Sequence, residues 1–322
     1  MTPDQFESIV ARANLAPSVH NMQPARWRRT PEGIDLFCDG ALGLPVSDPE
    51  GRDMGLSCGA ALEATVLAAS KEGIGLSVEP LWQGPPGAQA LAPVARLTLG
   101  EPVEPLPLAG QLDDRFTFRG PFDARPVNLF GWSPESAVLV TDARRIDRIA
   151  ALNDAAALGQ MRRKGVRREL LDWMRLGLRH PRYGIDGMSR AALRMAPVEA
   201  RAAGLVLGPL WPLFDRLGLT AGLTAEAAAT RTAPVIAGFH RAAEEDPVSS
   251  GRQYLRLWLA ATSLGMAGWP MAALTDDPEA RAEMERLLVL PPGRRLIQVL
   301  RFGMPTDAAP PRARRPLSEL IV

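Results

Sequence analysis

The chain has 322 residues, of which 46% are hydrophobic, and its 37 basic and 36 acidic residues almost cancel to a formal net charge of +1. This length suffices for one large or two ordinary domains, and the balanced charge argues against a nucleic-acid-binding protein, which usually has a strong basic excess. The longest apolar run, residues 202–214, is broken by glycine and proline and is too short for a membrane span of ~20 residues. We expect neither nucleic acid nor a membrane as a partner.

The first part of the chain predicts a mixture of helices and strands. A capping box with proline at the first helical position starts a helix at residue 3. Further along, the patterns predict strands at 34–38 and 94–99, a turn at 48–53, and a helix over 57–73 that is apolar nearly all round and therefore buried. Prolines 102, 105 and 107 resemble a linker, so we divide the chain into domains 1–108 and 109–322.

Polar side chains stand between two prolines directly after the first predicted helix, in the segment 16–27. Pro17 cannot continue a helix and biases the residue before it out of the helical region. Ser18, Asn21 and Gln23 are then free to offer hydrogen bonds from a stiffened loop. On its own this segment indicates no more than a polar loop at the exit of a helix.

The second part of the chain predicts strands at 137–140, 234–239 and 295–301 and a buried helix over 251–265. Residues 146–231 lack a counterpart in the first part, so we interpret them as a helical insertion or lid. Its residues 160–201 hold eleven basic and four acidic side chains. This excess would favour an anionic cosubstrate, and a solvated helix face is the alternative explanation.

The two parts are related by an internal repeat. The set Gly59, Leu67, Ala68, Ala69 and Gly73 recurs 192 positions later as Gly251, Leu259, Ala260, Ala261 and Gly265. After the strands that follow, Gly100 and Pro102 recur as Gly303 and Pro305. The shared order of buried helix, glycine, strand and Gly-x-Pro favours duplication of one α+β unit, whose two buried helices would pair in one core.

Arginines are spaced by two residues at two places. Arg115, Thr117 and Arg119 would point the same way from an extended segment, and Arg312 and Arg314 repeat the spacing near the C-terminus. Guanidinium groups that converge suit a phosphate, because each one binds it through two charge-assisted hydrogen bonds. Unrelated arginines in solvated loops would give the same pattern.

Gly268, Trp269 and Pro270 follow the second buried helix, where a glycine would let a flat ligand approach the backbone and Trp269 could stack on it. A helix end with Trp269 in the core is the alternative. The three histidines are scattered, and the chain has no nucleotide-binding glycine motif. We assign no catalytic side chain and no metal ligand.

Cys38 and Cys58 have neither metal-ligand spacing nor a histidine cluster nearby, and the first ten residues lack the basic start of a signal peptide. We therefore expect reduced thiols in a cytoplasmic protein.

These segments together resemble the FMN-dependent nitroreductase family. In that family an R-x-[ST]-x-[RK] segment near the start of a subunit and a [KR]-x-R-x-P-L segment near its end hold the phosphate of FMN. DRFTFRGPF and RARRPLSEL match them, so the resemblance places Arg115, Thr117, Arg119, Arg312 and Arg314 at the phosphate.

A third family motif, P-S-x-x-N-x-Q-P-W, contacts the isoalloxazine ring and usually comes from the other subunit of a dimer. PSVHNMQPARW matches it, which implies ring contacts from Pro17, Ser18, Asn21, Gln23 and Pro24. The segment Gly268, Trp269 and Pro270 resembles the family's backbone contact near flavin N5.

The distribution of the motifs allows one composite site, because the ring motif lies in the first part and both phosphate segments lie in the second. This matches the duplicated, single-chain (Acg-like) branch, which Ser57 to Leu62 and the insertion also resemble. The resemblance implies an α+β fold with two tandem nitroreductase-like repeats. They would form a pseudo-dimer around paired buried helices, with the inserted lid. We expect a monomer, since a pseudo-dimer has already buried the family's subunit interface.

The function that this resemblance implies is an FMN-dependent oxidoreductase. It would take hydride from NAD(P)H and reduce a nitroaromatic, quinone-like or other electrophilic small molecule. Two alternatives stay open: an FMN-binding or storage protein with little turnover, and an enzyme that consumes the flavin itself.

Overall fold

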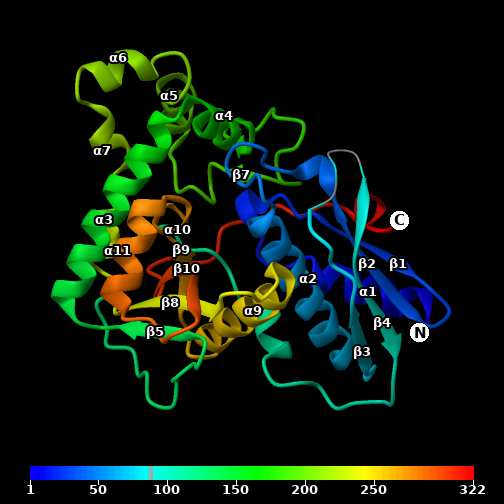
Figure 1. Cartoon of the computed structure of the whole chain (residues 1–322). Coiled ribbons are helices and arrows are strands. Elements are labelled where there is room, and N and C mark those ends of the chain that lie inside the picture. Colours follow the sequence, from blue (N-terminus) through cyan, green and yellow to red (C-terminus); the bar gives the residue numbers. More distant parts are fainter. Residues whose placement is uncertain (86, 88–89) are drawn as a thin grey trace.

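The structure is a computed structural model that describes residues 1–85, 87 and 90–322. Two four-stranded antiparallel sheets lie on opposite sides of a central pair of helices, α2 and α9 (Figure 1). These are α2 (Arg52–Lys71) and α9 (Pro247–Ser263). The molecule is therefore built around the two helices that the repeat predicts to be buried.

The first sheet has the strand order β1-β2-β4-β3, with bounds β1 (Ala25–Arg29), β2 (Gly33–Asp39), β4 (Leu91–Leu99) and β3 (Leu76–Pro80). Alternate residues of β2 are fully buried, as the period of a half-buried strand requires. Helix α1 (Pro3–Ala13) packs beside α2 and begins with the predicted capping box between Thr2 and Gln5.

The second sheet has the order β5-β8-β10-β9, with bounds β5 (Ala137–Val140), β8 (Val235–Ala242), β10 (Arg294–Gly303) and β9 (Ala267–Pro270). In each sheet the first strand along the chain pairs with the second, the second with the fourth and the fourth with the third. The long helix follows the second strand in both. The predicted tandem α+β repeat is confirmed, whereas the division at residue 108 stays a prediction.

Helices α2 and α9 approach each other closely at two glycines. A β-carbon on Gly59 would collide with the backbone of Val248, and one on Gly251 with the backbone of Leu56. Near this crossing the fully buried carboxylate of Glu63 accepts hydrogen bonds from two arginines of α9, Arg252 at 2.8 Å and Arg256 at 2.6 Å. Leu255 and Leu259 of α9 join the core of the first sheet, so the two halves share one interior.

The insertion forms an arm that stands out from the second half (Figure 1). It begins in the first turn of α3 and ends just after α8. Its helices are α3 (Ala143–Arg162), α4 (Lys164–Asp172), α5 (Pro197–Val206), α6 (Trp211–Arg216), α7 (Thr220–Thr224) and α8 (Ala227–Thr230). Between α4 and α5 two short parallel strands, β6 (Met174–Arg175) and β7 (Met188–Ser189), bring the chain back to the first half.

The C-terminal segment crosses from the second half to the first. Its last helix, α12 (Leu317–Leu320), lies against α1 and β1, and the amide of Val322 donates to the carbonyl of Trp27 at 2.9 Å. Figure 1 shows the C-terminus beside β1 and β2. This crossing carries Arg312 and Arg314 to the first repeat. No helix among the described residues is long and apolar enough to span a bilayer.

Several boundaries differ from the sequence prediction. The predicted turn at 48–53 contains the start of α2, because the carboxylate of Asp48 accepts from the amides of Arg52 and Met54 and caps the helix five residues early. Strands β1, β3 and β9 were missed, since they are short and carry arginine or proline where an apolar alternation would show. The prediction also overlooked α10 (Ala273–Asp276) and α11 (Pro278–Leu288), which cover β10.

Candidate functional site

Three arginines from two distant segments meet beside α9. Arg115 is only 4% exposed, and its guanidinium lies 4.9 Å from the ring centre of Trp258. The carbonyl of Leu15 accepts from Arg115 Nη2 at 2.7 Å and from Arg314 Nη2 at 3.2 Å. Arg312 Nη2 donates to the carbonyl of Arg115 at 3.2 Å and also to that of Asp113. We call Arg115, Arg312 and Arg314 the three-arginine cluster.

The three-arginine cluster has hydrogen-bonding capacity left over. Within the described part of the chain, Arg115 Nε and Nη1 and Arg314 Nε are buried without a partner, and no carboxylate pairs with any member. Burial, reinforced by neighbouring arginines, lowers the pKa of Arg115 to about 9 and that of Arg314 to about 10. Buried cations are normally paired, so this arrangement calls for an anion.

The loop 17–24 is held in an unusual backbone conformation opposite this cluster. His20, Asn21 and Gln23 all have positive φ, at 47°, 58° and 57°. Such angles are costly for residues other than glycine and persist only where neighbouring contacts fix them. Here Ser18 Oγ accepts from the amide of Gln23 at 3.0 Å, and the amide of Val19 donates to Ser57 Oγ on α2 at 3.1 Å.

Asn21 joins the loop to the three-arginine cluster. Its Oδ1 accepts from Arg314 Nη1 at 2.9 Å, while its Nδ2 donates to the carbonyls of Ala313 and Gly187, both at 3.1 Å. A residue of the first repeat thus contacts the C-terminal segment of the same chain and the insertion at once.

Gln23 is likewise satisfied by the protein. Its Oε1 accepts from Asn14 Nδ2 and from the amide of Arg315, and its Nε2 donates to the carbonyl of Ile185 at 3.0 Å. The expectation that Ser18, Asn21 and Gln23 offer free hydrogen-bonding groups is therefore wrong for this structure. The reason is that Ser18 pairs with the amide of Gln23 within the loop, and that the insertion and the C-terminal segment supply partners for Asn21 and Gln23. Sequence spacing does not reveal these contacts.

The segment from Arg115 to Arg119 does not present its three polar side chains to one place. The amide of Arg115 donates to the carbonyl of Gln111 at 3.0 Å and closes a turn, so the extended alternation starts only after it. Thr117 then forms an isolated bridge with Gly268, and Arg119 Nη1 donates to the carbonyl of Ala192 at 3.0 Å. The predicted convergence is corrected: Arg115 joins the three-arginine cluster, whereas Thr117 and Arg119 line a cavity.

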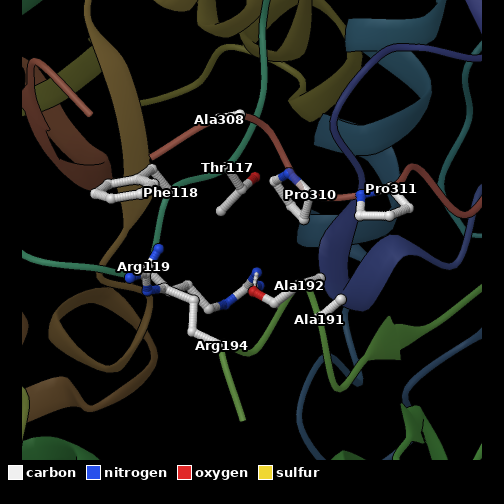
Figure 2. A pocket seen from close by; sticks show the side chains of 9 residues that line it. All are labelled: Thr117, Phe118, Arg119, Ala191, Ala192, Arg194, Ala308, Pro310 and Pro311. Atoms are coloured by element: carbon white, nitrogen blue, oxygen red, sulfur yellow. Dashed lines mark hydrogen bonds between the residues drawn. The ribbon is translucent and has the colours of Figure 1, made fainter. Parts of the chain in front are cut away.

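That cavity has a volume of about 350 Å³ and lies between the segment 117–119, the insertion and the C-terminal segment (Figure 2). A volume of this order suits a small organic ligand. Nine residues line the cavity: Thr117, Phe118, Arg119, Ala191, Ala192, Arg194, Ala308, Pro310 and Pro311. Its walls combine six apolar residues with two guanidinium groups and one hydroxyl.

Gly268, Trp269 and Pro270 belong to strand β9 rather than to a loop. The carbonyl of Gly268 accepts from the amide of Phe118 at 3.0 Å, and a β-carbon on Gly268 would lie 2.5 Å from the ring of Phe302. Trp269 is half-buried with Arg301 stacked on its ring at 4.2 Å. Sheet pairing and core packing thus account for these residues, and their contact with a flavin stays a prediction.

A buried network of ion pairs around Asp186, here called the Asp186 network, joins the insertion to the C-terminal segment. Sequence reasoning missed it. Asp186, 2% exposed, accepts from Arg175 Nη2 at 2.8 Å, Arg182 Nε at 2.9 Å and Arg315 Nη2 at 2.7 Å. Glu319 on α12 also pairs with Arg182 and Arg315. The only sequence signal was the arginine-rich stretch itself, in which nothing singled out these members.

His20 belongs to the loop 17–24 and is close enough to Arg119, a residue of the cavity wall, to be affected by its charge. Burial, with Arg119 nearby, lowers the pKa of His20 to about 4, and Glu169 opposes the shift. The imidazole is therefore neutral at pH 7, which limits the positive charge beside Arg119.

The chain has relatives among curated proteins, although no family model matches it. Over 333 aligned residues it is 28% identical to a Mycobacterium tuberculosis protein named "Putative NAD(P)H nitroreductase Rv3131", covering 99% of this chain and 91% of the relative. Over 79 residues it is 38% identical to "Putative NAD(P)H nitroreductase acg" of the same species, which is 24% of each. Over nearly its whole length the chain is thus similar to a protein named as a nitroreductase. The motif resemblance, including the Acg-like branch, is confirmed at this level.

Among solved structures, the chain aligns with the FMN-dependent nitroreductase NfnB from Mycobacterium smegmatis in complex with NADPH. The alignment covers 65% of this chain and 94% of that one, with 19% identity and a TM-score of 0.38. So distant a likeness carries no argument about the site.

Proposed function

We propose that this chain binds one FMN and acts as an oxidoreductase that takes hydride from NAD(P)H and reduces a small electrophilic molecule. The observation that carries the proposal is the three-arginine cluster, in which two nitrogens of Arg115 are buried without a partner among the described residues. A phosphate would supply the missing acceptors and the missing negative charge together. The residues present therefore fit the phosphate end of FMN.

In this proposal Arg115, Arg312 and Arg314 hold the phosphate, and Arg115 is fixed in place by Trp258 and the carbonyl of Leu15. The loop 17–24 and the segment 117–119 border the rest of the cofactor. Pro17, Ser18, Asn21, Gln23 and Pro24 act by positioning, because the side-chain amides already hold the insertion and the C-terminal segment. Gly268, Trp269 and Pro270 complete the proposed site through the backbone of β9.

Bound FMN would supply two-electron chemistry between the nicotinamide donor and a nitroaromatic, quinone-like or other electrophilic acceptor. The chain's own residues bind, orient and shield the reactants, and no side chain is assigned as acid or base. The names of the relatives support the nitroreductase-type reaction. The cytoplasm as location and the monomeric state are parts of the same proposal.

A second function, FMN binding or storage with little turnover, is favoured by one feature. The carbonyls of Ile185 and Gly187 in the insertion accept hydrogen bonds from the side-chain amides of Gln23 and Asn21. These two residues belong to the loop that would border the flavin. If the insertion stays in this position, NADH or NADPH cannot reach the isoalloxazine ring.

Anaerobic stopped-flow spectroscopy separates the two functions. The FMN-loaded protein is mixed with NADH or NADPH, and bleaching of the flavin band is followed against free FMN. We expect at least one nucleotide to bleach the bound flavin faster than free FMN. Equal or slower bleaching with both would contradict the oxidoreductase proposal and favour storage, and a protein that takes up no FMN would contradict both.

A further inference from the structure

Three short helices of the insertion leave most of their apolar side chains exposed. Helices α5, α6 and α7 have one buried residue each, namely Ala200, Trp211 and Thr220. Half of the large apolar side chains that are exposed among the described residues lie in this one stretch of the chain. We call them the arm patch, and they are Val198, Leu205, Leu210, Leu213, Leu217, Leu219 and Leu223.

The arm patch lies at the outer end of the arm. Figure 1 shows α5 and α6 at the end of the arm that is farthest from the two sheets. Leu213 and Leu217 are 54% and 61% exposed and stand one helical turn apart, so they face the same way. Single exposed leucines need no explanation, but apolar side chains gathered on one part of a surface mark a site of interaction. The arm patch therefore calls for an apolar partner.

Exposed cations border the arm patch. The start of α4 lies against α6, because Arg162 pairs with Asp215 at 3.0 Å and the guanidinium of Arg167 lies 4.9 Å from the ring centre of Trp211. Five exposed basic residues at the start of α4 and on α4, α5 and α6 have no carboxylate partner in the part of the chain that the structure describes: Arg163, Lys164, Arg168, Arg201 and Arg216.

The same helices carry a smaller opposing charge. Among the described residues of α4 to α7, only Asp172 and Glu199 are exposed carboxylates. The outer end of the arm thus combines aliphatic side chains with a surplus of unpaired positive charge. Segments with leucine on one side and lysine or arginine around it are typical of proteins that lie in the interface of a membrane. Their cations meet anionic headgroups while the leucines enter the acyl region.

Another protein fits this surface less well. A two-fold contact between two copies of this chain through the arm patch would place the unpaired cations of one copy against those of the other. Binding hot spots between proteins are rich in tryptophan, tyrosine and arginine and poor in leucine and valine. The exposed members of the arm patch are all leucine or valine, and Trp211 is buried beneath them.

We propose that the arm patch and its bordering cations dock this chain on the surface of a membrane that contains anionic lipids. The expectation that a membrane is not a partner was argued from the lack of a spanning run, and docking at the surface requires no such run. The inference does not rest on the proposed function, because it uses no residue that is assigned to FMN.

The test is flotation of lipid vesicles with the full chain in a density gradient. One set of vesicles contains phosphatidylcholine alone, and the other contains equal parts of phosphatidylcholine and phosphatidylglycerol. We expect the chain to bind the mixed vesicles at least roughly tenfold more tightly, since each cation near an anionic surface contributes about fivefold. Added salt should weaken this binding, because it screens exposed charges.

Two variants separate the apolar contribution from the charged one. Leu213→Ser combined with Leu217→Ser should weaken binding to the mixed vesicles by roughly tenfold or more, because two leucines no longer enter the lipid. Arg216→Glu should weaken it by a similar factor. The matched controls lie outside the insertion and should bind as wild type: Phe130→Ser, which replaces a side chain that is 93% exposed, and Arg29→Glu, which reverses an exposed charge on β1.

Three results would overturn the docking surface: no binding of the wild type to the mixed vesicles, equal binding to both kinds of vesicle, or unchanged binding by the double leucine variant. Light scattering without lipid adds a fourth. A dimer that the double leucine variant loses would assign the arm patch to a second copy of this chain. Circular dichroism confirms that each variant is folded. Vesicle binding should be the same with and without FMN, so a failure to take up FMN would contradict only the proposed function.

Discussion

Gly251 on α9 faces Gly59 on α2 so closely that a β-carbon on either residue would lie 2.9 Å from the α-carbon of the other. The two repeats therefore meet backbone to backbone at the centre of the molecule. Of the glycine pairs that define the internal repeat, this pair allows its two copies to pack so closely.

Gly251→Ala should destabilise the fold by ~2–3 kcal/mol, because the added methyl group collides with the backbone of Leu56 and forces the helices apart. Urea denaturation followed by circular dichroism measures the loss. Gly159→Ala is the matched control, since that glycine lies on α3 with open space where a β-carbon would be. The control should gain up to ~1 kcal/mol from helix propensity. Equal effects of the two substitutions would contradict the close crossing.

Arg115→Ala should weaken FMN binding by at least tenfold, since losing a charge-assisted pair costs ~1.5–3 kcal/mol. Titration with quenching of flavin fluorescence gives the affinity. Riboflavin, which lacks the phosphate, should bind Arg115→Ala and the wild type equally. If Arg115→Ala weakens both ligands to the same extent, the residue supports the fold and not the phosphate.

Asp186→Asn should loosen the insertion, because three arginines lose their shared buried carboxylate. We expect a cost of ~3 kcal/mol in unfolding free energy and faster tryptic cleavage after the exposed Arg179. Asp147→Asn, which breaks the exposed pair with Arg231, should cost less than ~1 kcal/mol and leave cleavage unchanged. An unchanged rate of proteolysis in Asp186→Asn would show that the Asp186 network does not hold the insertion in place.

His20 should make the fold sensitive to acid. Its pKa of about 4 in the folded state lies below the unfolded value of 6.5, so between these values the unfolded chain binds a proton that the folded chain does not. Stability is therefore lost as the pH falls through this window. His20→Gln should lose less stability than the wild type between pH 7 and pH 4.5 in urea titrations. Equal losses of stability in His20→Gln and in the wild type would mean that His20 is solvated.

The sequence predicted the repeat because buried helices and their glycines leave a regular pattern. Gly59 of the first buried helix recurs as Gly251 of the second, and each helix is followed by a strand that ends in Gly-x-Pro. Short strands such as β9 could not be predicted in the same way, since their extended form depends on pairing with β10 and with Thr117.

The candidate site was predictable only in part. The motif spacing identified Arg115 and Arg314, which the fold brings within reach of one carbonyl. It did not show that the side chain of Arg115 separates from those of Thr117 and Arg119, because a turn at Arg115 interrupts the extended run. Asp186 and Arg194 could not be found at all, since their roles depend on contacts between the insertion and residues more than a hundred positions away.

The central claim is that one FMN site is assembled from both halves of a single chain, and the stoichiometry of binding tests it most directly. Flavin-free protein is titrated with FMN while light scattering reports the mass of the particle in solution. The account predicts one FMN per chain, bound by a monomer of 34.7 kDa. Two FMN per chain, or binding only by a dimer, would contradict it.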